Sequence, residues 1–184
     1  MIFADGHKVI LRPLDKKDLP TTLQWRNNPN IRENIQGYRF PVIEEMEVKW
    51  YQREEFEQFP AKVVFAIDTI VNKEFVGYIH LSRIDWISRF CFMGIVIGPE
   101  YSRQGFGLDA MHLLSHYAFN LLNLRKICLE VVSFNKEAIR AYKKFGFYEE
   151  GVQRQQVYLE QKYHDVHLMG LLKEDYFSLT NQKS

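Results

Sequence analysis

The chain has 184 residues, 46% of them hydrophobic and 15% aromatic, which is enough for one globular domain with a substantial core and too little for two. With 24 basic and 23 acidic residues, its formal charge of +1 argues against a nucleic-acid-binding protein and against a protein held on an anionic membrane. The N-terminus lacks the pattern of a secretory signal, and no apolar run approaches the roughly 20 residues that span a bilayer. We therefore expect a cytoplasmic protein with one domain over residues 1–178 and a polar tail over residues 179–184.

The first third of the chain predicts one strand and two helices. Residues 8–12 are typical of a strand, which Pro13 stops. Asp15 is placed to cap a helix that ends at residues 27–29, where the sequence is Asn-Asn-Pro. Apolar residues at helical spacing predict a second helix over about residues 44–56.

The middle of the chain changes to a strand pattern. Residues 62–98 are rich in β-branched and aromatic residues, with breaks at residues 72–73 and 85–88, and predict a three-stranded antiparallel meander. Apolar residues at a spacing that places them on one side of a helix then predict a helix over about residues 108–122, followed by a strand over residues 126–132.

The last third predicts a short helix and a hairpin. Asn135 can cap a helix over residues 136–145, and Gly146 stands where a left-handed residue ends such a helix. Two strands follow, at about residues 153–159 and 163–172. The predicted architecture is an α+β (mixed α/β) domain, in which about four helices flank a central, mostly antiparallel, seven-stranded sheet.

The cysteines and two of the histidines have ordinary structural explanations. Cys91 and Cys128 lie in apolar strand-like runs, which favours reduced core residues over a disulfide or a nucleophile. His112 and His116 are four residues apart on the long helix, but the glutamate of the H-E-x-x-H motif is missing and no third ligand is near. We expect no metal site.

Gly105 and Gly107 lie between the third strand of the meander and the long helix, and a bare backbone there requires an explanation. A Walker motif is excluded because no Lys-Ser or Lys-Thr follows a glycine at the required spacing. Gly105-x-Gly107-x-x-Ala110 matches the dinucleotide fingerprint, with Glu130 about 20 residues on as the ribose-binding acid. The antiparallel meander before it argues against this interpretation, because the fingerprint belongs to a parallel βαβ unit.

A third interpretation is a pyrophosphate site. Glycines without side chains let successive backbone N–H groups and the N-terminus of a helix surround an anion. Arg103 can add a positive charge at the rim. For these residues taken alone, a plain tight turn remains the alternative.

Two longer stretches resemble the acetyl-CoA-binding motifs of the GNAT N-acetyltransferases: IGPEYSRQGFGLDAMHLLSHYAF and LRKICLEVVSFNKEAIRAYKKFGF. The resemblance is to the branch that contains spermidine acetyltransferases and ribosomal-protein N-terminal acetyltransferases, and it covers nearly the whole chain. Ser102 stands where the family usually has Gln or Arg, which affects one side-chain contact and leaves the backbone cradle intact.

The resemblance implies a sheet splayed between its fourth and fifth strands, with acetyl-CoA bound in the opening. The backbone of Ile95, Val96 and Ile97 would then hydrogen-bond to the pantetheine arm, and Asn135 would contact it. Tyr142 would lie beside the thioester sulfur as general acid, although packing along a helix is its ordinary alternative. The resemblance assigns the pyrophosphate to a loop of seven residues: Ser102, Arg103, Gln104, Gly105, Phe106, Gly107 and Leu108.

The general base has three candidates from the same resemblance. His80 and Asp85 lie on or at the end of a strand that faces the acceptor cleft in the related enzymes, and Glu33 lies in the helical region that covers it. Each has an ordinary alternative as a strand residue, a turn former or a surface charge, respectively.

We therefore predict an N-acetyltransferase that moves the acetyl group of acetyl-CoA to a primary amine by direct attack in a ternary complex. The acceptor classes in the related enzymes are amino sugars, amino acids, peptide N-termini and polyamines. A non-catalytic acyl-CoA-binding module and a dinucleotide-binding oxidoreductase are the alternatives. The aromatic-rich C-terminal strands suit the edge of a homodimer.

Charge narrows the choice of acceptor. The segment expected to roof the cleft contains Arg26 and Arg32, with Arg39 next to it, against the single acid Glu33. The net positive charge of this segment predicts that spermidine is a poor substrate and that the acceptor carries an anionic or hydroxyl group. The prediction fails if the glutamates of residues 44–57 face the cleft.

Overall fold

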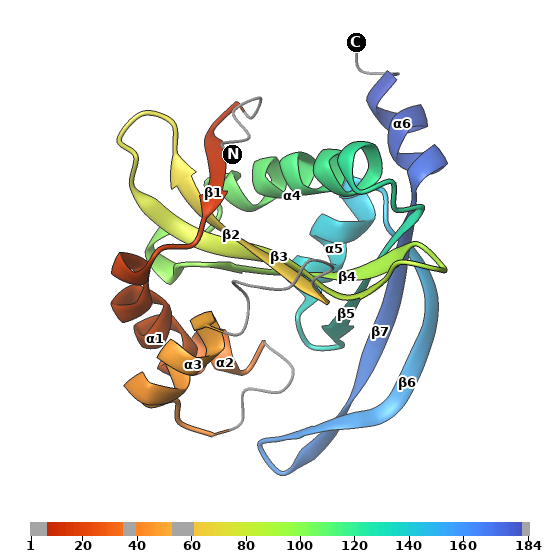
Figure 1. Ribbon diagram of the computed structural model, residues 1–184. Coiled ribbons are helices and arrows are strands. Elements are labelled where there is room, and N and C mark those ends of the chain that lie inside the picture. Colours follow the sequence, from red (N-terminus) through yellow and green to blue (C-terminus); the bar gives the residue numbers. More distant parts are fainter. Residues whose placement is uncertain (1–6, 35–39, 53–60, 182–184) are drawn as a thin grey trace.

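The computed structural model describes residues 7–34, 40–52 and 61–181 of the chain, and Figure 1 shows its strands and helices. The strands are β1 (Val9–Pro13), β2 (Lys62–Thr69), β3 (Phe75–Asp85), β4 (Phe90–Ile97), β5 (Lys126–Val132), β6 (Tyr148–Leu159) and β7 (Lys162–Leu172). The helices are α1 (Leu19–Asn27), α2 (Pro29–Arg32), α3 (Glu44–Gln52), α4 (Phe106–His116), α5 (Lys136–Phe145) and α6 (Lys173–Asn181).

The strands form one seven-stranded sheet in the order β1-β2-β3-β4-β5-β7-β6. Neighbouring strands run antiparallel, with the exception of the parallel pair β4 and β5. That pair holds together only from Phe90 opposite Lys126 to Phe92 opposite Cys128, so the two strands separate beyond it. The predicted α+β fold, with a mostly antiparallel sheet that is splayed between its fourth and fifth strands, is confirmed.

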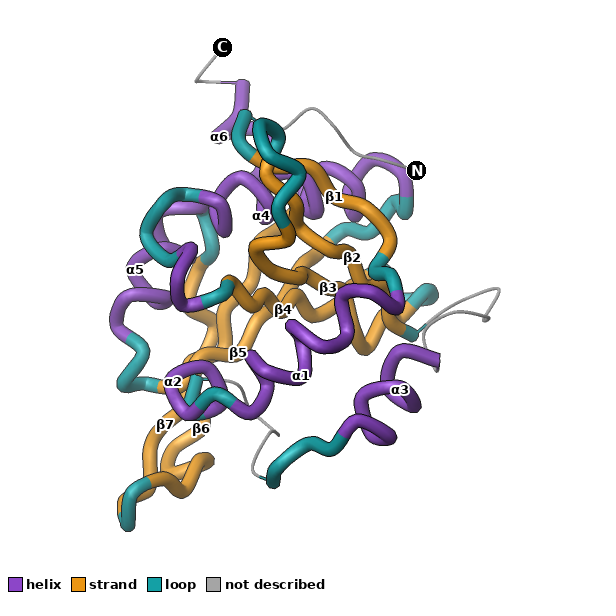
Figure 2. The backbone as a smooth tube through the Cα atoms, turned by 90° about the vertical axis from the view of Figure 1, so that its left-hand side faces the viewer, coloured by secondary structure: helices purple, strands orange, loops and turns teal. Residues whose placement is uncertain are grey.

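The two faces of the sheet carry different helices. Because successive side chains of a strand point to opposite faces, Ile79 and Leu81 of β3 join the main core with α4, α5 and α6, whereas Tyr78 packs with Trp25 of α1 in a smaller cluster. Figure 2 shows α1, α2 and α3 grouped on one side of the sheet, away from α4 and α6. Among the described residues, no helix is long and apolar enough to cross a membrane.

Local sequence signals explain several of the boundaries. Asp15 forms a capping box with Asp18 ahead of α1, and Asn135 accepts a hydrogen bond from the backbone N–H of Ala138 at the start of α5. Gly146 ends α5 with a φ of 121°. The strand predicted over residues 126–132 is confirmed as β5.

Other boundaries differ from the prediction. Helices α2 and α6 were not predicted, and β6 begins at Tyr148 instead of about residue 153, because its exposed first half lacks the expected alternation. The long helix is α-helical only to His116 and continues as a π-helical turn over Tyr117–Leu121. Helix α3 is described to Gln52, and the remainder of the predicted helix lies outside the described residues.

The cysteines and histidines singled out in the sequence lie in ordinary packing environments. Cys91 and Cys128 are free thiols, and burial raises the pKa of Cys91 to about 12. The ring of His112 packs 4.5 Å from that of Phe145, and His116 contacts the amide of Asn120. The described part of the chain contains no group of side chains that could hold a metal ion.

Candidate active site

The separation of β4 from β5 opens the sheet. Beyond Phe92, the edge of β4 that faces β5 has no strand partner among the described residues, so an extended molecule can hydrogen-bond to it as an added strand. Side chains alternate along β4, which places Gly94 and Val96 on one face and Ile95 on the other. The opening therefore has two sides, and each side has a cavity.

The first cavity has a volume of 730 Å³ and lies between the end of β4, the start of α4 and α5. Val96 does not line it and faces the other side. Gln104 does not line it either: its side-chain amide donates to the carbonyl of Glu100 (3.2 Å), and its backbone carbonyl accepts a hydrogen bond from Lys8 Nζ (2.8 Å). The remaining residues predicted to hold the cofactor or the thioester come together here: Ile95, Ile97, Ser102, Arg103, Gly105, Phe106, Gly107, Leu108, Asn135 and Tyr142.

The glycine loop has the geometry expected at the start of a helix. Gly105 has a φ of 85°, in the left-handed region that favours glycine, and α4 begins directly after it. The first N–H groups of α4 have no carbonyl partner within the helix and lie at the cavity. Asp109 accepts the backbone N–H of Lys8 (2.7 Å), which fixes β1 beside the loop and places the Lys8 ammonium next to Gly105. The sequence did not predict that the ammonium of Lys8 lies beside the glycine loop.

Arg103 lies at the rim of this cavity, and it is paired. Its guanidinium donates to the carboxylate of Glu137 on α5, with Nη2 3.0 Å from Oε2. Hydrogen bonding to Arg103 lowers the pKa of Glu137. The positive charge predicted at the rim is therefore partly neutralised in the structure.

Tyr142 of α5 lines this cavity and also the cavity on the opposite side of the opening. Burial raises the pKa of its phenol to about 12, so the group remains a hydrogen-bond donor at neutral pH. Its ring also packs edge-on against Phe147, with 5.9 Å between the centroids. Both interpretations of this residue, a site residue and a packing residue, thus describe part of its surroundings.

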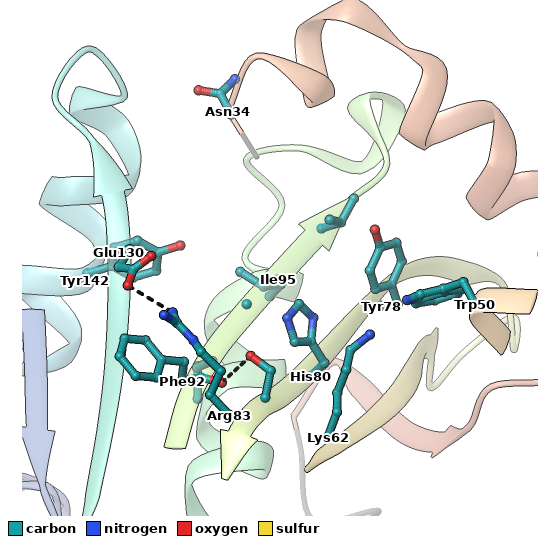
Figure 3. A pocket seen from close by; sticks show the side chains of 14 residues that line it. Asn34, Trp50, Lys62, Tyr78, His80, Arg83, Phe92, Ile95, Glu130 and Tyr142 are labelled. Atoms are coloured by element: carbon teal, nitrogen blue, oxygen red, sulfur yellow. Dashed lines mark hydrogen bonds and ion pairs between the residues drawn. The ribbon is translucent and has the colours of Figure 1, made fainter. Parts of the chain in front are cut away.

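The second cavity has a volume of 430 Å³ and lies on the side of the sheet that carries α1 and α3. Figure 3 shows Arg83 reaching toward Glu130 at one end of this cavity, with Lys62 and Trp50 at the other. Arg83 Nη2 donates to Glu130 Oε1 at 2.9 Å. Charged and aromatic side chains line the cavity: Trp50, Lys62, Tyr78, His80, Arg83, Phe92, Glu130 and Tyr142.

His80 is the one candidate base that lines this cavity. Burial, together with the charges of Lys62 and Arg26, lowers its pKa to about 3, so the imidazole is neutral at physiological pH. Its Nδ1 atom is buried and has no hydrogen-bond partner among the described residues.

The other two candidate bases are not brought to the cavity. Asp85 accepts the backbone N–H groups of Ile87 (2.9 Å) and Ser88 (2.7 Å) and stabilises the turn between β3 and β4. Glu33 is exposed after α2, while its neighbour Asn34 lines the cavity.

Sequence reasoning missed most of the second cavity. Glu130 was considered only as a ribose-binding acid, but it lines the second cavity and not the one at the glycine loop. A carboxylate in an otherwise apolar strand was the available signal. Nothing local marked Arg83 as its partner, because 47 residues separate the two in sequence.

The charges expected in the roof of the cleft are distributed differently. Arg26 is buried and pairs with Glu47, with Nη1 2.6 Å from Oε2, so it adds no net charge to the cavity. Glu44 and Glu45 of α3 are exposed and do not line the cavity. Arg39, Glu54, Glu55 and Glu57 lie outside the described residues.

Comparison with known proteins gives a consistent result. Residues 8–148 match the model of the acetyltransferase (GNAT) domain. Spermidine N(1)-acetyltransferase of Vibrio cholerae serotype O1 is 29% identical over 178 residues (93% of this chain and 96% of the relative), and that of Escherichia coli K12 is 28% identical over 173 residues (94% and 90%).

Solved structures agree with the fold. The crystal structure of spermidine N-acetyltransferase from Vibrio cholerae in complex with CoA and spermine has a TM-score of 0.84 at 28% identity, covering 92% of this chain and 98% of the other. A dodecameric structure of the Vibrio cholerae enzyme has a TM-score of 0.78 at 26% identity, covering 93% and 97%. The chain therefore belongs to the GNAT acetyltransferase family, and it is an N-acetyltransferase that transfers the acetyl group of acetyl-CoA to an amine.

Proposed function

We propose that the acceptor is a primary amine that carries an anionic or hydroxyl group near the amine, bound in the second cavity while acetyl-CoA occupies the first. The charge of the second cavity carries this proposal. Among the described lining residues Glu130 is the one carboxylate, and it is already paired with Arg83, so these residues offer no second carboxylate to a polycation. A cavity with this balance favours an acceptor with negative or neutral groups over a polycation.

The first cavity supports the cofactor assignment. We propose that the unpaired edge of β4 binds the pantetheine arm and that the loop from Ser102 to Leu108 binds the pyrophosphate through backbone N–H groups. Asn135 uses its Oδ1 atom to cap α5, which leaves the Nδ2 donor for the pantetheine. Lys8 lies close enough to the loop to add a positive charge.

The reaction needs a neutral amine, a donor for the developing oxyanion and stabilisation of the departing thiolate. An amine with a pKa near 10.4 is neutral in about one molecule in 2,500 at pH 7. The amine nitrogen attacks the thioester carbonyl, the C–S bond breaks, and the proton lost by the amine passes to solvent. Tyr142, positioned where both cavities meet, donates a hydrogen bond to the leaving sulfur.

Tyr142 is proposed to stabilise the thiolate by hydrogen bonding. Its phenol has a pKa of about 12, and a thiolate belongs to a thiol of pKa near 8.5. Complete proton transfer from the phenol would therefore cost roughly 5 kcal/mol.

Spermidine is the second candidate acceptor, because the Vibrio cholerae and Escherichia coli relatives are spermidine acetyltransferases. Steady-state kinetics with spermidine, glucosamine, L-serine and the peptide Ala-Ala-Ala distinguish the two candidates. We expect a higher kcat/KM for at least one of the last three than for spermidine. The highest value for spermidine would contradict the proposal.

We also propose that the enzyme forms a homodimer through β6. This strand is at the edge of the sheet, and the hairpin of β6 and β7 projects beyond the other strands (Figure 1). Tyr148, Tyr158 and Tyr163 are exposed on the hairpin, as expected of a surface that a second copy covers. Light scattering of the wild type and of Tyr158→Lys tests this, and a monomeric wild type would contradict it.

A further inference from the structure

The ion pair of Arg83 and Glu130 spans the opening between β4 and β5. Glu130 lies two residues beyond Cys128, the last residue of β5 that pairs with β4, and its carboxylate is on the side of the second cavity. Arg83 comes from β3, on the far side of β4, and its guanidinium carbon lies 3.4 Å above the ring centroid of Phe92. Figure 3 shows this side chain extending over Phe92 to the carboxylate.

This ion pair is open to solvent on the arginine side. The side chain of Arg83 is 57% exposed and that of Glu130 is 22% exposed. The ion pair of Arg26 and Glu47, which joins α1 to α3, is 6% and 1% exposed and is also bonded to Thr22. An exposed pair contributes little to stability, whereas a buried pair of that kind is costly to break. The guanidinium of Arg83 can therefore leave Glu130 without disrupting the fold.

The carboxylate of Glu130 is close to the place of reaction, because Glu130 and Tyr142 line the same cavity. At neutral pH an amine acceptor arrives as an ammonium ion, which requires a counter-ion when it leaves water. Among the described residues that line the cavity, Glu130 is the carboxylate that can supply one. A guanidinium and an ammonium bind a carboxylate through the same N–H donors, so they compete for it.

We infer that Glu130 binds the ammonium group of the acceptor and that Arg83 occupies this position until the acceptor displaces it. The inference rests on the proposed function, since it places the acceptor in the second cavity. Arg83 is then an internal competitor. The apparent affinity for the acceptor equals the intrinsic affinity multiplied by the fraction of time during which the ion pair is open. For an exposed ion pair this lowers the affinity about two- to sixfold.

The competitor model predicts effects of opposite sign for the two partners of one ion pair. The probe is propylamine, binding to the enzyme loaded with CoA, measured by calorimetry at pH 7. We expect Glu130→Gln to weaken binding at least tenfold and Arg83→Gln to strengthen it about two- to sixfold. Arg83→Lys retains the charge and should give a smaller gain than Arg83→Gln. The double variant should bind as weakly as Glu130→Gln alone.

A second ion pair on β5 provides matched controls. Lys126 Nζ lies 2.7 Å from the carboxylate of Glu150, away from both cavities. Glu150→Gln and Lys126→Gln remove one charge each and should leave the binding of propylamine unchanged. Melting temperatures of all the variants within a few degrees of wild type show that the affinities describe folded protein.

If the ion pair of Arg83 and Glu130 has only a structural role, the binding measurements give a different result. If Arg83→Gln and Glu130→Gln shift the affinity in the same direction, or if neither shifts it, the inference is wrong. Propylamine binding does not depend on which natural acceptor is used. If spermidine is the best substrate in the panel of amines, the proposed acceptor class is wrong. The competition between Arg83 and the ammonium is decided separately, by the binding of propylamine.

Discussion

The imidazole of His80 on β3 lies against Gly94, its register partner on β4, so closely that a Cβ on Gly94 would stand 2.6 Å from His80 Nε2. The glycine is required here by the neighbouring side chain, since its own φ is not in the left-handed region. Both residues line the second cavity, and Figure 3 shows the imidazole of His80 between Lys62 on one side and the ion pair of Arg83 and Glu130 on the other.

Gly94→Ala should therefore displace the imidazole. We expect kcat/KM for the amine to fall at least tenfold and the free energy of unfolding to fall by about 1–3 kcal/mol, the usual cost of overpacking. The affinity for acetyl-CoA should change little, because Gly94 does not line the first cavity, whereas Ile95 and Ile97 do. Steady-state kinetics, denaturant unfolding and calorimetry measure the three quantities.

The double variant Gly94→Ala with His80→Ala is the control for this contact. It removes the clash and should recover most of the lost stability, while the acceptor kinetics remain impaired. Gly151→Ala adds a Cβ where the nearest atom is 3.9 Å away and should be neutral. Equal destabilisation of the single and double variants would show that the contact between His80 and Gly94 is not the cause.

His80 also makes stability depend on pH. Its pKa is about 3 in the folded protein and near 6.5 in the unfolded chain, so between these values the unfolded chain binds a proton that the folded protein does not. Stability from this group is fully present above pH 6.5 and is lost as the pH falls toward 3. By linkage the loss at pH 5 is about 2 kcal/mol, or about 4–8 °C in Tm.

Thermal unfolding at pH 7 and pH 5 tests this prediction. The decrease in Tm between the two pH values should be smaller for His80→Asn than for wild type. His116→Asn, at an exposed position, should behave as wild type does. Identical decreases in wild type and His80→Asn would mean that His80 titrates normally in the folded protein.

The features that could be predicted from the sequence are those determined by residues close to one another in the chain. The strand over residues 126–132 and the cap at Asn135 are determined by neighbouring residues, and both were predicted at the correct positions. The glycine loop was found because a left-handed residue at Gly105 and a helix start leave a local signature.

The second cavity is made by tertiary contacts, and its residues leave no such signature. Trp50 and Lys62 flank a segment outside the described residues and meet only in space, with the Lys62 ammonium 4.8 Å from the ring centroid of Trp50. The charge of Arg26 was correctly read from the sequence, but its neutralisation by Glu47 depends on the packing of α1 against α3. Charge predictions for the cleft consequently required the structure.

Tyr142→Phe separates the chemical role of the phenol from its packing. We expect kcat to fall about 10- to 1,000-fold, as when one donor to a developing charge is removed, with the affinity for acetyl-CoA within twofold of wild type. Because the phenol has a pKa of about 12, the decrease should be the same at pH 6 and pH 9. Tyr148→Phe, at a 66% exposed position, is the control. A wild-type kcat in Tyr142→Phe would assign this residue to the core alone.

Gly105→Val tests the phosphate cradle. A β-branched residue disfavours a φ of 85°, and its Cβ would stand 3.0 Å from Lys8 Nζ, so the loop and the nearby Lys8 ammonium must shift and we expect acetyl-CoA to bind at least tenfold more weakly. Gly151→Val has an ordinary φ and an open position away from the cavities, and it should keep the wild-type affinity. Calorimetry on variants with a near-wild-type Tm decides the matter, and unchanged affinity in Gly105→Val would refute the cradle.

The charge of Lys62 should determine the preference among acceptors. Lys62→Glu turns a cavity with two cations and one described carboxylate into one with one cation and two carboxylates, which favours a cation of charge about +3. We expect kcat/KM for spermidine to rise at least tenfold relative to that for L-serine or glucosamine. Lys49→Glu changes the same charge at an exposed position of α3 outside the cavity and should leave the ratio unchanged. Two results together would contradict this prediction: a wild-type kcat/KM for spermidine above about 10⁴ M⁻¹s⁻¹ and above that for the other amines, and no effect of Lys62→Glu. They would show that charges outside this cavity select the acceptor.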